Sequence, residues 1–178
     1  MSSKSLVAAA AGAATLAACT SPSASDRPQA LLAEEVARLA ADTAEANAAL
    51  MRGDVDRHRA IVALSDDFTL MSPFGGSPSR GRDLTREDWD RIGRFFRNGT
   101  FEQELVESYA TDGMIVLVLI ERTHVQVGGL PAQPWALRVT LVYTRAGDRW
   151  QLAHRHADPL ANGLDLAAAA SLARGTAE

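Results

Sequence analysis

The chain has 178 residues, of which 47% are hydrophobic and 22% are charged, and its formal net charge is −4. That length allows one ordinary domain with a sizeable core, and the composition is that of a globular protein. The sequence has no basic run, which argues against a nucleic-acid partner, and its only cysteine is Cys19, which excludes an intrachain disulfide.

The first 19 residues have the pattern of an export signal. Lys4 precedes an apolar, Ala-rich run that is too short to span a membrane and that ends in Leu-Ala-Ala-Cys at Cys19. This ending resembles the lipobox of bacterial lipoproteins, in which the cysteine is lipidated. The resemblance implies an exported protein, anchored by a lipid at Cys19 on the periplasmic or outer cell-surface side. An Ala-rich helix or a disordered start is the alternative. Residues 20–30 are rich in Ser and Pro, which predicts a flexible tether.

Apolar residues at helical spacing predict three helices in the first half of the chain. The predicted helices cover residues 30–52, 54–64 and 86–97, and the third begins with the capping pair Thr85 and Asp88. Between the second and third helices, Ser65–Asp67 is predicted as a turn, Phe68–Ser72 as a short strand and residues 73–82 as a loop. Asp66 and Asp67 could share acid and base roles, but the turn explains this pair better.

Four long strands are predicted in the second half, from alternating hydrophobicity between turn signals. They cover residues 100–110, 114–127, 136–145 and 149–157, and Asn98-Gly99 is predicted as a turn before the first of them. Helices followed by a strand meander predict an α+β fold in which a strongly bent antiparallel sheet wraps on about three N-terminal helices and leaves a cone-shaped cavity. This domain spans residues 31–159, and residues 160–178 form an Ala-rich tail that is either a loosely docked helix or disordered.

The last two strands form a hairpin around Gly147-Asp148. With a two-residue turn and regular pairing, Leu141 lies opposite His154 and Val139 lies opposite His156. The hairpin therefore predicts two imidazoles on an otherwise apolar sheet face.

The order of elements resembles the SnoaL-like branch of the nuclear transport factor 2 superfamily. The residues that carry the resemblance are Gly53-Asp54, Ser65–Leu70, Gly81-Arg82 and Gly147–His156. The ending Trp-x-x-x-His-x-His is also similar to the association domain of calcium/calmodulin-dependent kinase. Leu141 and Ala157 stand where that domain has arginines, so its carboxylate binding is not carried over. The superfamily contains isomerases, cyclases, dehydratases, hydrolases and non-catalytic binders, so the resemblance implies the cone fold and no single activity.

An imidazole inside such a cone could act as a general base, and His154 is the candidate catalytic residue. The alternative is that both histidines only hold the sheet together. The candidate ligand-pocket residues are Trp89, Arg122, His124, Leu141, Tyr143, His154 and His156. Arg122 and His124 either line the cavity and orient an anion or form the solvated end of a strand, with Glu121 on the opposite face. The two histidines have no clear third ligand, so no metal is predicted, and the absence of any fingerprint predicts no cofactor.

Three functions are compatible with these patterns. The first is binding of a small, largely apolar molecule in the cone. The second is an isomerase or dehydratase that uses His154 as base. The third is a dimeric interaction module, in which the convex sheet face forms a homodimer through Arg138, Thr140, Val142, Gln151 and Arg155.

Overall fold

The computed structural model describes residues 26–174. The predicted export signal, with Cys19, lies outside the described residues. The helices are α1 (Asp26–Met51), α2 (Val55–Ile61), α3 (Arg86–Phe95) and α4 (Leu166–Ala173), with a short 3₁₀ turn at Gly81–Asp83. The strands are β1 (Leu64–Met71), β2 (Ser79–Arg80), β3 (Phe96–Ala110), β4 (Met114–Val127), β5 (Gln133–Ala146) and β6 (Arg149–Pro159). None of the helices in the described part of the chain is long and apolar enough to cross a membrane.

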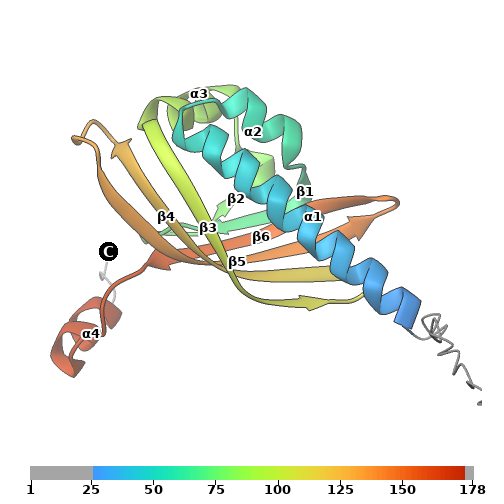
Figure 1. The fold of residues 1–178 in the computed structure, drawn as a ribbon. Helices are drawn as coiled ribbons and strands as arrows, with labels where there is room; N and C mark the ends of the chain where they lie inside the picture. Colours follow the sequence, from blue (N-terminus) through green and yellow to red (C-terminus); the bar gives the residue numbers. More distant parts are fainter. Residues whose placement is uncertain (1–25, 175–178) are drawn as a thin grey trace, which may run out of the picture.

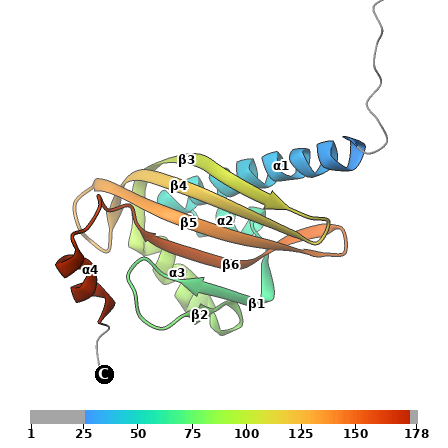
Figure 2. The same cartoon turned by 90° about the horizontal axis from the view of Figure 1, so that it is seen from below.

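The six strands form one curved sheet in the order β2-β1-β6-β5-β4-β3. All neighbouring strands pair in antiparallel fashion except β1 and β6, which are parallel to each other. Helix α1 crosses the concave face of the sheet, and α2 and α3 cover one end of it (Figure 1). Seen from below, the four long strands lie in front of α1 and α4 stands away from the sheet (Figure 2). The predicted α+β cone is confirmed.

One face of helix α1 packs into the sheet. Its buried positions include Val36, Leu39, Thr43 and Ala46, which recur every three or four residues as one helix face requires. Ala46 and Ala49 are fully buried, and their small side chains let the helix backbone approach the strands closely. The helix begins earlier than predicted, because Asp26–Gln29 belongs to α1 and not to the tether.

The helix starts follow the predicted capping chemistry. The Asp54 carboxylate accepts a hydrogen bond from the Arg57 backbone N–H at 3.0 Å, and Gly53 adopts a φ of 88° that only glycine takes easily. Thr85 and Asp88 form a reciprocal capping box at the start of α3. The Thr85 hydrogen bonds hold the pKa of the Asp88 carboxyl below its ordinary value.

Two predicted turns are wrong. Ser65–Asp67 lies within β1, where the pairing with β6 is irregular between Leu64 and Thr69. Asn98-Gly99 lies within β3, since α3 ends at Phe95 and the strand begins at once. The pairing of β3 with β4 shifts after Arg97 and Asn98 has a φ of 55°, so the residues that suggested a turn form a bulge instead.

Strand β4 is buried on one face only. Its burial alternates, with Ile115, Leu117 and Leu119 buried and the residues between them half-buried or exposed. The continuously apolar run Met114–Ile120 would suggest a strand covered on both faces, and the structure contradicts that interpretation. The buried face joins the main core, which fills much of the space between α1 and the sheet.

The hairpin of β5 and β6 has the predicted turn but not the predicted register. Ala146 pairs with Arg149, as a two-residue turn requires. The pairing then shifts between Val142 and Tyr143, where Ala153 has no partner. Beyond this bulge each residue of β6 faces the side opposite to the predicted one, because side chains alternate along a strand.

Candidate functional site

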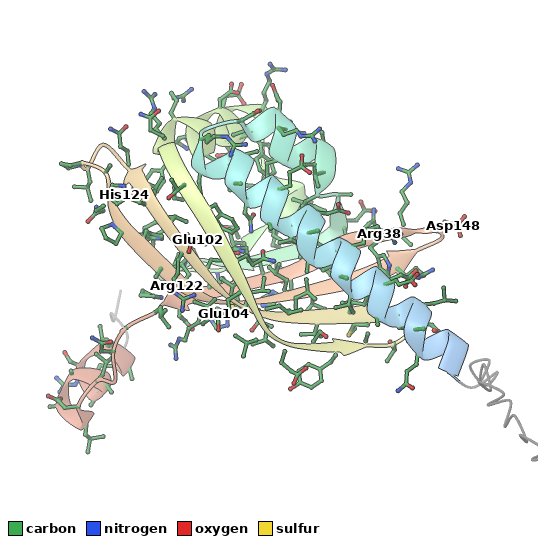
Figure 3. The ribbon with its side chains drawn as sticks, viewed as in Figure 1. Arg38, Glu102, Glu104, Arg122, His124 and Asp148 are labelled. Carbon is green, nitrogen blue, oxygen red and sulfur yellow. The ribbon has the colours of Figure 1, made fainter. Side chains whose placement is uncertain are left out.

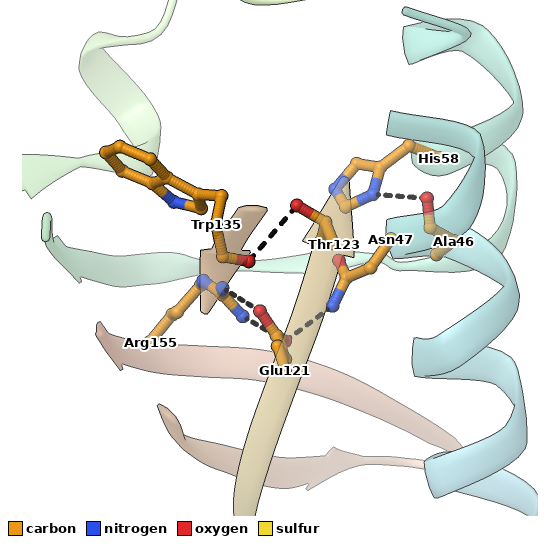
Figure 4. A network of polar contacts seen from close by, with 7 residues as sticks. All are labelled: Ala46, Asn47, His58, Glu121, Thr123, Trp135 and Arg155. Atoms are coloured by element: carbon orange, nitrogen blue, oxygen red, sulfur yellow. Dashed lines mark hydrogen bonds and ion pairs between the residues drawn. The ribbon is translucent and has the colours of Figure 1, made fainter. Parts of the chain in front are cut away.

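An ion pair lies on the concave face between α1 and the sheet (Figure 4). The Arg155 guanidinium donates to both carboxylate oxygens of Glu121, at 2.9 and 2.7 Å. Asn47 of α1 donates to the same carboxylate at 2.9 Å. The Glu121 side chain is only 4% exposed and the Arg155 side chain is 20% exposed, so the pair lies largely in the interior.

The bulge at Ala153 places Arg155 in this position. Beyond the bulge Arg155 pairs with Leu141, whose side chain is in the core, and so points to the concave face. Glu121 is in phase with the buried residues of β4. Although burial alone disfavours a charged guanidinium, the Glu121 charge and hydrogen bonds raise the pKa of Arg155 above its ordinary value. The guanidinium therefore stays charged beside the Glu121 carboxylate.

Glu121, Arg155 and Asn47 together form a polar group. Tyr143 and Thr43 extend this polar group along α1. The Thr43 hydroxyl donates to the Leu39 carbonyl at 2.6 Å, so its single hydrogen is used and the Tyr143 phenol donates to the Thr43 oxygen at 2.7 Å. Burial raises the pKa of Tyr143 to about 12, which keeps the phenol protonated. Tyr143 was predicted to line the ligand pocket, and its hydroxyl does reach this interior group.

His58 of α2 is the imidazole on the helix side of the polar group (Figure 4). Its Nδ1 lies 3.2 Å from the Ala46 carbonyl oxygen, which can only accept a hydrogen bond. In the tautomer that makes this bond Nδ1 carries the hydrogen, and Nε2 is the basic nitrogen. Burial lowers the pKa of His58, and the nearby Arg155 charge acts in the same direction, while the bond to Ala46 and the Glu121 charge oppose it. The ring is therefore neutral near pH 7.

We expect the ring protons of His58 to titrate below the ordinary value of 6.5 in an NMR pH titration. The unfolded chain then binds the proton more readily than the folded chain. The contribution to stability is thus fully present above pH 6.5 and is lost as the pH falls through the lowered pKa. A His58→Gln variant removes this part of the pH dependence. A His58 titration at or above 6.5 would contradict the burial argument.

His154 and His156 lie on the convex face, so the predicted placement inside the cone is wrong. They pair with Val142 and Thr140, which face away from the core. The His154 Nδ1 lies 2.7 Å from the Thr69 hydroxyl of β1, and His156 lies 3.5 Å from Asp158. These contacts lie on the outer surface of the sheet. They fit the alternative interpretation that both histidines only hold the sheet together.

The other predicted pocket residues are dispersed. Arg122 and His124 are exposed on the outer side of β4, and Arg122 pairs with Glu104 at 2.8 Å (Figure 3). Leu141 is 1% exposed and is part of the packed core. Trp89 of α3 is half-buried, with its ring 6.2 Å from that of His58.

Aromatic side chains lie beside the polar group at the end of the sheet near α3. The Trp135 carbonyl accepts from Thr123, the concave neighbour of Glu121, at 3.2 Å. Phe74 packs on Trp135 at 5.4 Å and on Phe95 at 5.6 Å between ring centroids. Phe74 is 55% exposed, so the aromatic cover of this end comes from a surface loop.

Sequence reasoning missed Asn47, His58, Glu121 and Arg155 as site residues. A signal for Glu121 existed, because a carboxylate in phase with the buried residues of β4 requires a buried cation. Between residues 26 and 174 no three His, Cys, Asp or Glu side chains are grouped so that they could hold a metal ion.

The bent sheet packed on N-terminal helices is the fold of solved proteins described as nuclear transport factor 2-like. The chain belongs to the family of SnoaL-like domains, whose model matches residues 40–161. No curated protein gives a significant match.

Solved structures share the fold at low identity. An NTF2-like protein from Salmonella enterica serovar Typhimurium is 14% identical with a TM-score of 0.60, and the match covers 78% of this chain and 98% of that one. A candidate NTF2-like dehydratase from Streptomyces avermitilis is 18% identical with a TM-score of 0.59, over 75% and 99%. A candidate kinase type II association domain from Thiobacillus denitrificans is 22% identical with a TM-score of 0.54, over 68% and 94%.

Proposed function

We propose that the chain binds a small, largely apolar, uncharged molecule beside the Glu121–Arg155 pair. The observation that carries the proposal is a buried carboxylate and guanidinium that are already paired with each other on the concave face. A guanidinium has five N–H donors and Glu121 takes two of them, which leaves donors for an oxygen of a ligand. Trp135, Phe95 and Phe74 supply apolar surface next to them.

The charge balance of the pair selects a neutral ligand. Arg155 and Glu121 compensate each other, so a carboxylate on the ligand would bring an uncompensated charge into a poorly solvated site. A hydroxyl or carbonyl oxygen can accept from Arg155 without that cost. The ligand class is therefore a neutral molecule with an apolar body and one polar group.

Two probes that differ in charge test this proposal. We expect 2-naphthol, which is neutral at pH 7, to shift the backbone amides of Asn47, Glu121 and Arg155 in NMR spectra. The anion 2-naphthoate should bind there about tenfold more weakly, a difference of roughly 1.4 kcal/mol. Glu121→Gln leaves the Arg155 charge uncompensated and should reverse the preference. Binding of both probes with equal affinity, or no shift at these amides, would refute the proposal.

An isomerase or dehydratase with His154 as base is not supported by this geometry. His154 lies on the convex face and is engaged with Thr69. A base for a ligand bound beside Arg155 would have to be His58, which is neutral and on the concave side. Binding is therefore the function that we propose. If the protein also catalysed a reaction on the bound molecule, His58 would be the base.

We also propose that two copies associate through the convex sheet face. That face carries Val116, Val118, Ile120 and Val142, which the strand pairing places side by side. Glu104 of β3 and Arg138 of β5 flank this apolar row, so an antiparallel copy can bring opposite charges together. Of the predicted interface residues, Arg155 is excluded because it points to the concave face.

We expect Val118→Glu to convert the dimer to a monomer in size-exclusion chromatography with light scattering, because it buries a charge at the centre of the interface. The control is Leu130→Glu, at a residue 54% exposed outside that face, which should leave the dimer intact. A wild-type monomer at all concentrations tested would exclude the interface.

Lipid anchoring at Cys19 remains our proposal for the location of the protein. The supporting observation is the Leu-Ala-Ala-Cys ending of an apolar run. Cys19→Ser should release the protein from the membrane fraction. A variant that stays membrane-bound would exclude the anchor.

A further inference from the structure

A cavity lies at the hairpin end of the sheet, and neither Glu121 nor Arg155 is among its lining residues. Its volume is about 430 Å³, and it lies between α1, the connection from α2 to β1, and the turn of β5 and β6. Volumes of roughly 300–1,000 Å³ are typical of small-molecule pockets. Arg38 of α1 and Asp148 of the turn mark this end in Figure 3.

The wall of the cavity combines apolar surface with cations. Leu39, Ile61, Tyr143 and Trp150 contribute the apolar part. Three arginines, Arg38, Arg59 and Arg149, face two aspartates, Asp42 and Asp148, so the charge balance is positive.

The cations are available for a ligand. Among residues 26–174, the ion pairs engage other arginines, including Arg145 with Glu35 at 2.5 Å, while Arg38 and Arg149 have no acidic partner within 4 Å. Arg59 lies over the Trp89 ring at 5.1 Å, which leaves its N–H edge for other acceptors.

The Trp150 indole supplies an independent observation. Its ring belongs to the cavity wall and is covered by the Arg145 guanidinium at 4.5 Å. The indole N–H is buried and has no acceptor in the described part of the chain. An unmet buried donor costs about 1–3 kcal/mol, so the indole would gain from a small shift that brings its N–H to an acceptor on a ligand in the cavity.

We propose that this cavity binds an organic oxyanion with an apolar body. The rings of Tyr143 and Trp150 would contact the apolar body, and Arg38, Arg59 and Arg149 would hold the oxyanion by charge-assisted hydrogen bonds. The two sites of the molecule thus select ligands of different charge. The concave site takes neutral molecules because its ion pair is balanced, and the hairpin-end cavity takes anions because its arginines are in excess.

Two dyes with the same ring system test the proposal on the folded chain. The first is 8-anilinonaphthalene-1-sulfonate, and the second is N-phenyl-1-naphthylamine, which lacks the sulfonate. We expect the sulfonate to bind saturably, by fluorescence, about tenfold more tightly than the amine, a difference of roughly 1.4 kcal/mol. It should shift the amides of residues 61–63 and 149–150 and leave those of Glu121 and Arg155 unchanged.

Variants with equal changes of net charge complete the test. Arg38→Gln and Arg149→Gln should each weaken sulfonate binding several-fold, and Ala60→Trp, at an exposed residue of the cavity wall, should abolish it. Arg52→Gln, at an exposed residue that is not part of the cavity wall, should leave it unchanged. Equal affinity for the two dyes, amide shifts elsewhere, or an equal loss in Arg52→Gln would overturn the proposal. None of these outcomes depends on whether the concave site binds its neutral probe.

Discussion

Arg155→Met is expected to lower the free energy of unfolding by about 3–5 kcal/mol, because it leaves the Glu121 carboxylate buried without its cation. Glu121 is 4% exposed, and Asn47 alone cannot compensate a full charge. Such a loss is a large part of the roughly 5–15 kcal/mol that stabilises an ordinary domain. Urea unfolding followed by circular dichroism measures the difference.

Two companion variants show whether the effect comes from burial of the charge. Arg122→Met removes an ion pair of similar length, Arg122 to Glu104 at 2.8 Å, whose side chains are 47% and 56% exposed. It should cost only about 0–1 kcal/mol, as surface pairs do. The double variant Glu121→Gln with Arg155→Met removes both charges and should recover most of the loss. Equal costs for Arg155→Met and Arg122→Met would show that the interior pair is not isolated from water.

Gly99→Ala is expected to destabilise the fold by about 1–3 kcal/mol through overpacking. A Cβ at this position would lie 2.7 Å from the Met51 carbonyl oxygen and 2.9 Å from a Val125 methyl group. Both neighbours are fixed, since Met51 ends α1 and Val125 is fully buried in β4. The bulge at the start of β3 therefore requires a residue without a side chain where it touches the end of α1.

The matched control for this substitution is Gly113→Ala, since a Cβ at Gly113 would meet no atom within 4 Å. Thermal unfolding of the two variants should differ clearly, with Gly113→Ala close to the wild type. If Gly99→Ala were as stable as Gly113→Ala, the close contact between β3 and α1 would not exist as described.

Most of the fold could be predicted because its signals are local. The helical spacing of α1, the capping pair Thr85 and Asp88, and the alternation in the long strands each depend on neighbours in sequence. The family resemblance then indicated how these elements assemble, and the matching family model confirms it.

The site was predicted less well because one unpaired residue in β6 moves every later side chain of that strand to the other face of the sheet. A bulge at Ala153 has no strong sequence signal, and yet it exchanges Arg155 with His154 and His156 between the two faces. The information that decides the register is long-range. Glu121 is buried because it alternates in step with the apolar residues of β4. Its carboxylate needs a cation, and Arg155 reaches it only because the bulge shifts the register of β6.

The helix residues of the site were missed for a related reason. Asn47 and His58 look like ordinary polar helix residues, and only the packing of α1 and α2 on the sheet shows what they contact. Tyr143 lies before the bulge, where the predicted alternation holds, and its side chain is buried with the apolar face of β5.

The central claim is that the paired charges of Glu121 and Arg155 form the ligand site. Native mass spectrometry of the chain purified from its own host tests it most directly. We predict an adduct of a neutral molecule on the wild type and on Arg122→Met. The adduct should be lost from the Glu121→Gln, Arg155→Met double variant, which is expected to stay folded. An adduct that persists in the double variant, or a wild type that carries none and does not bind 2-naphthol, would contradict the claim.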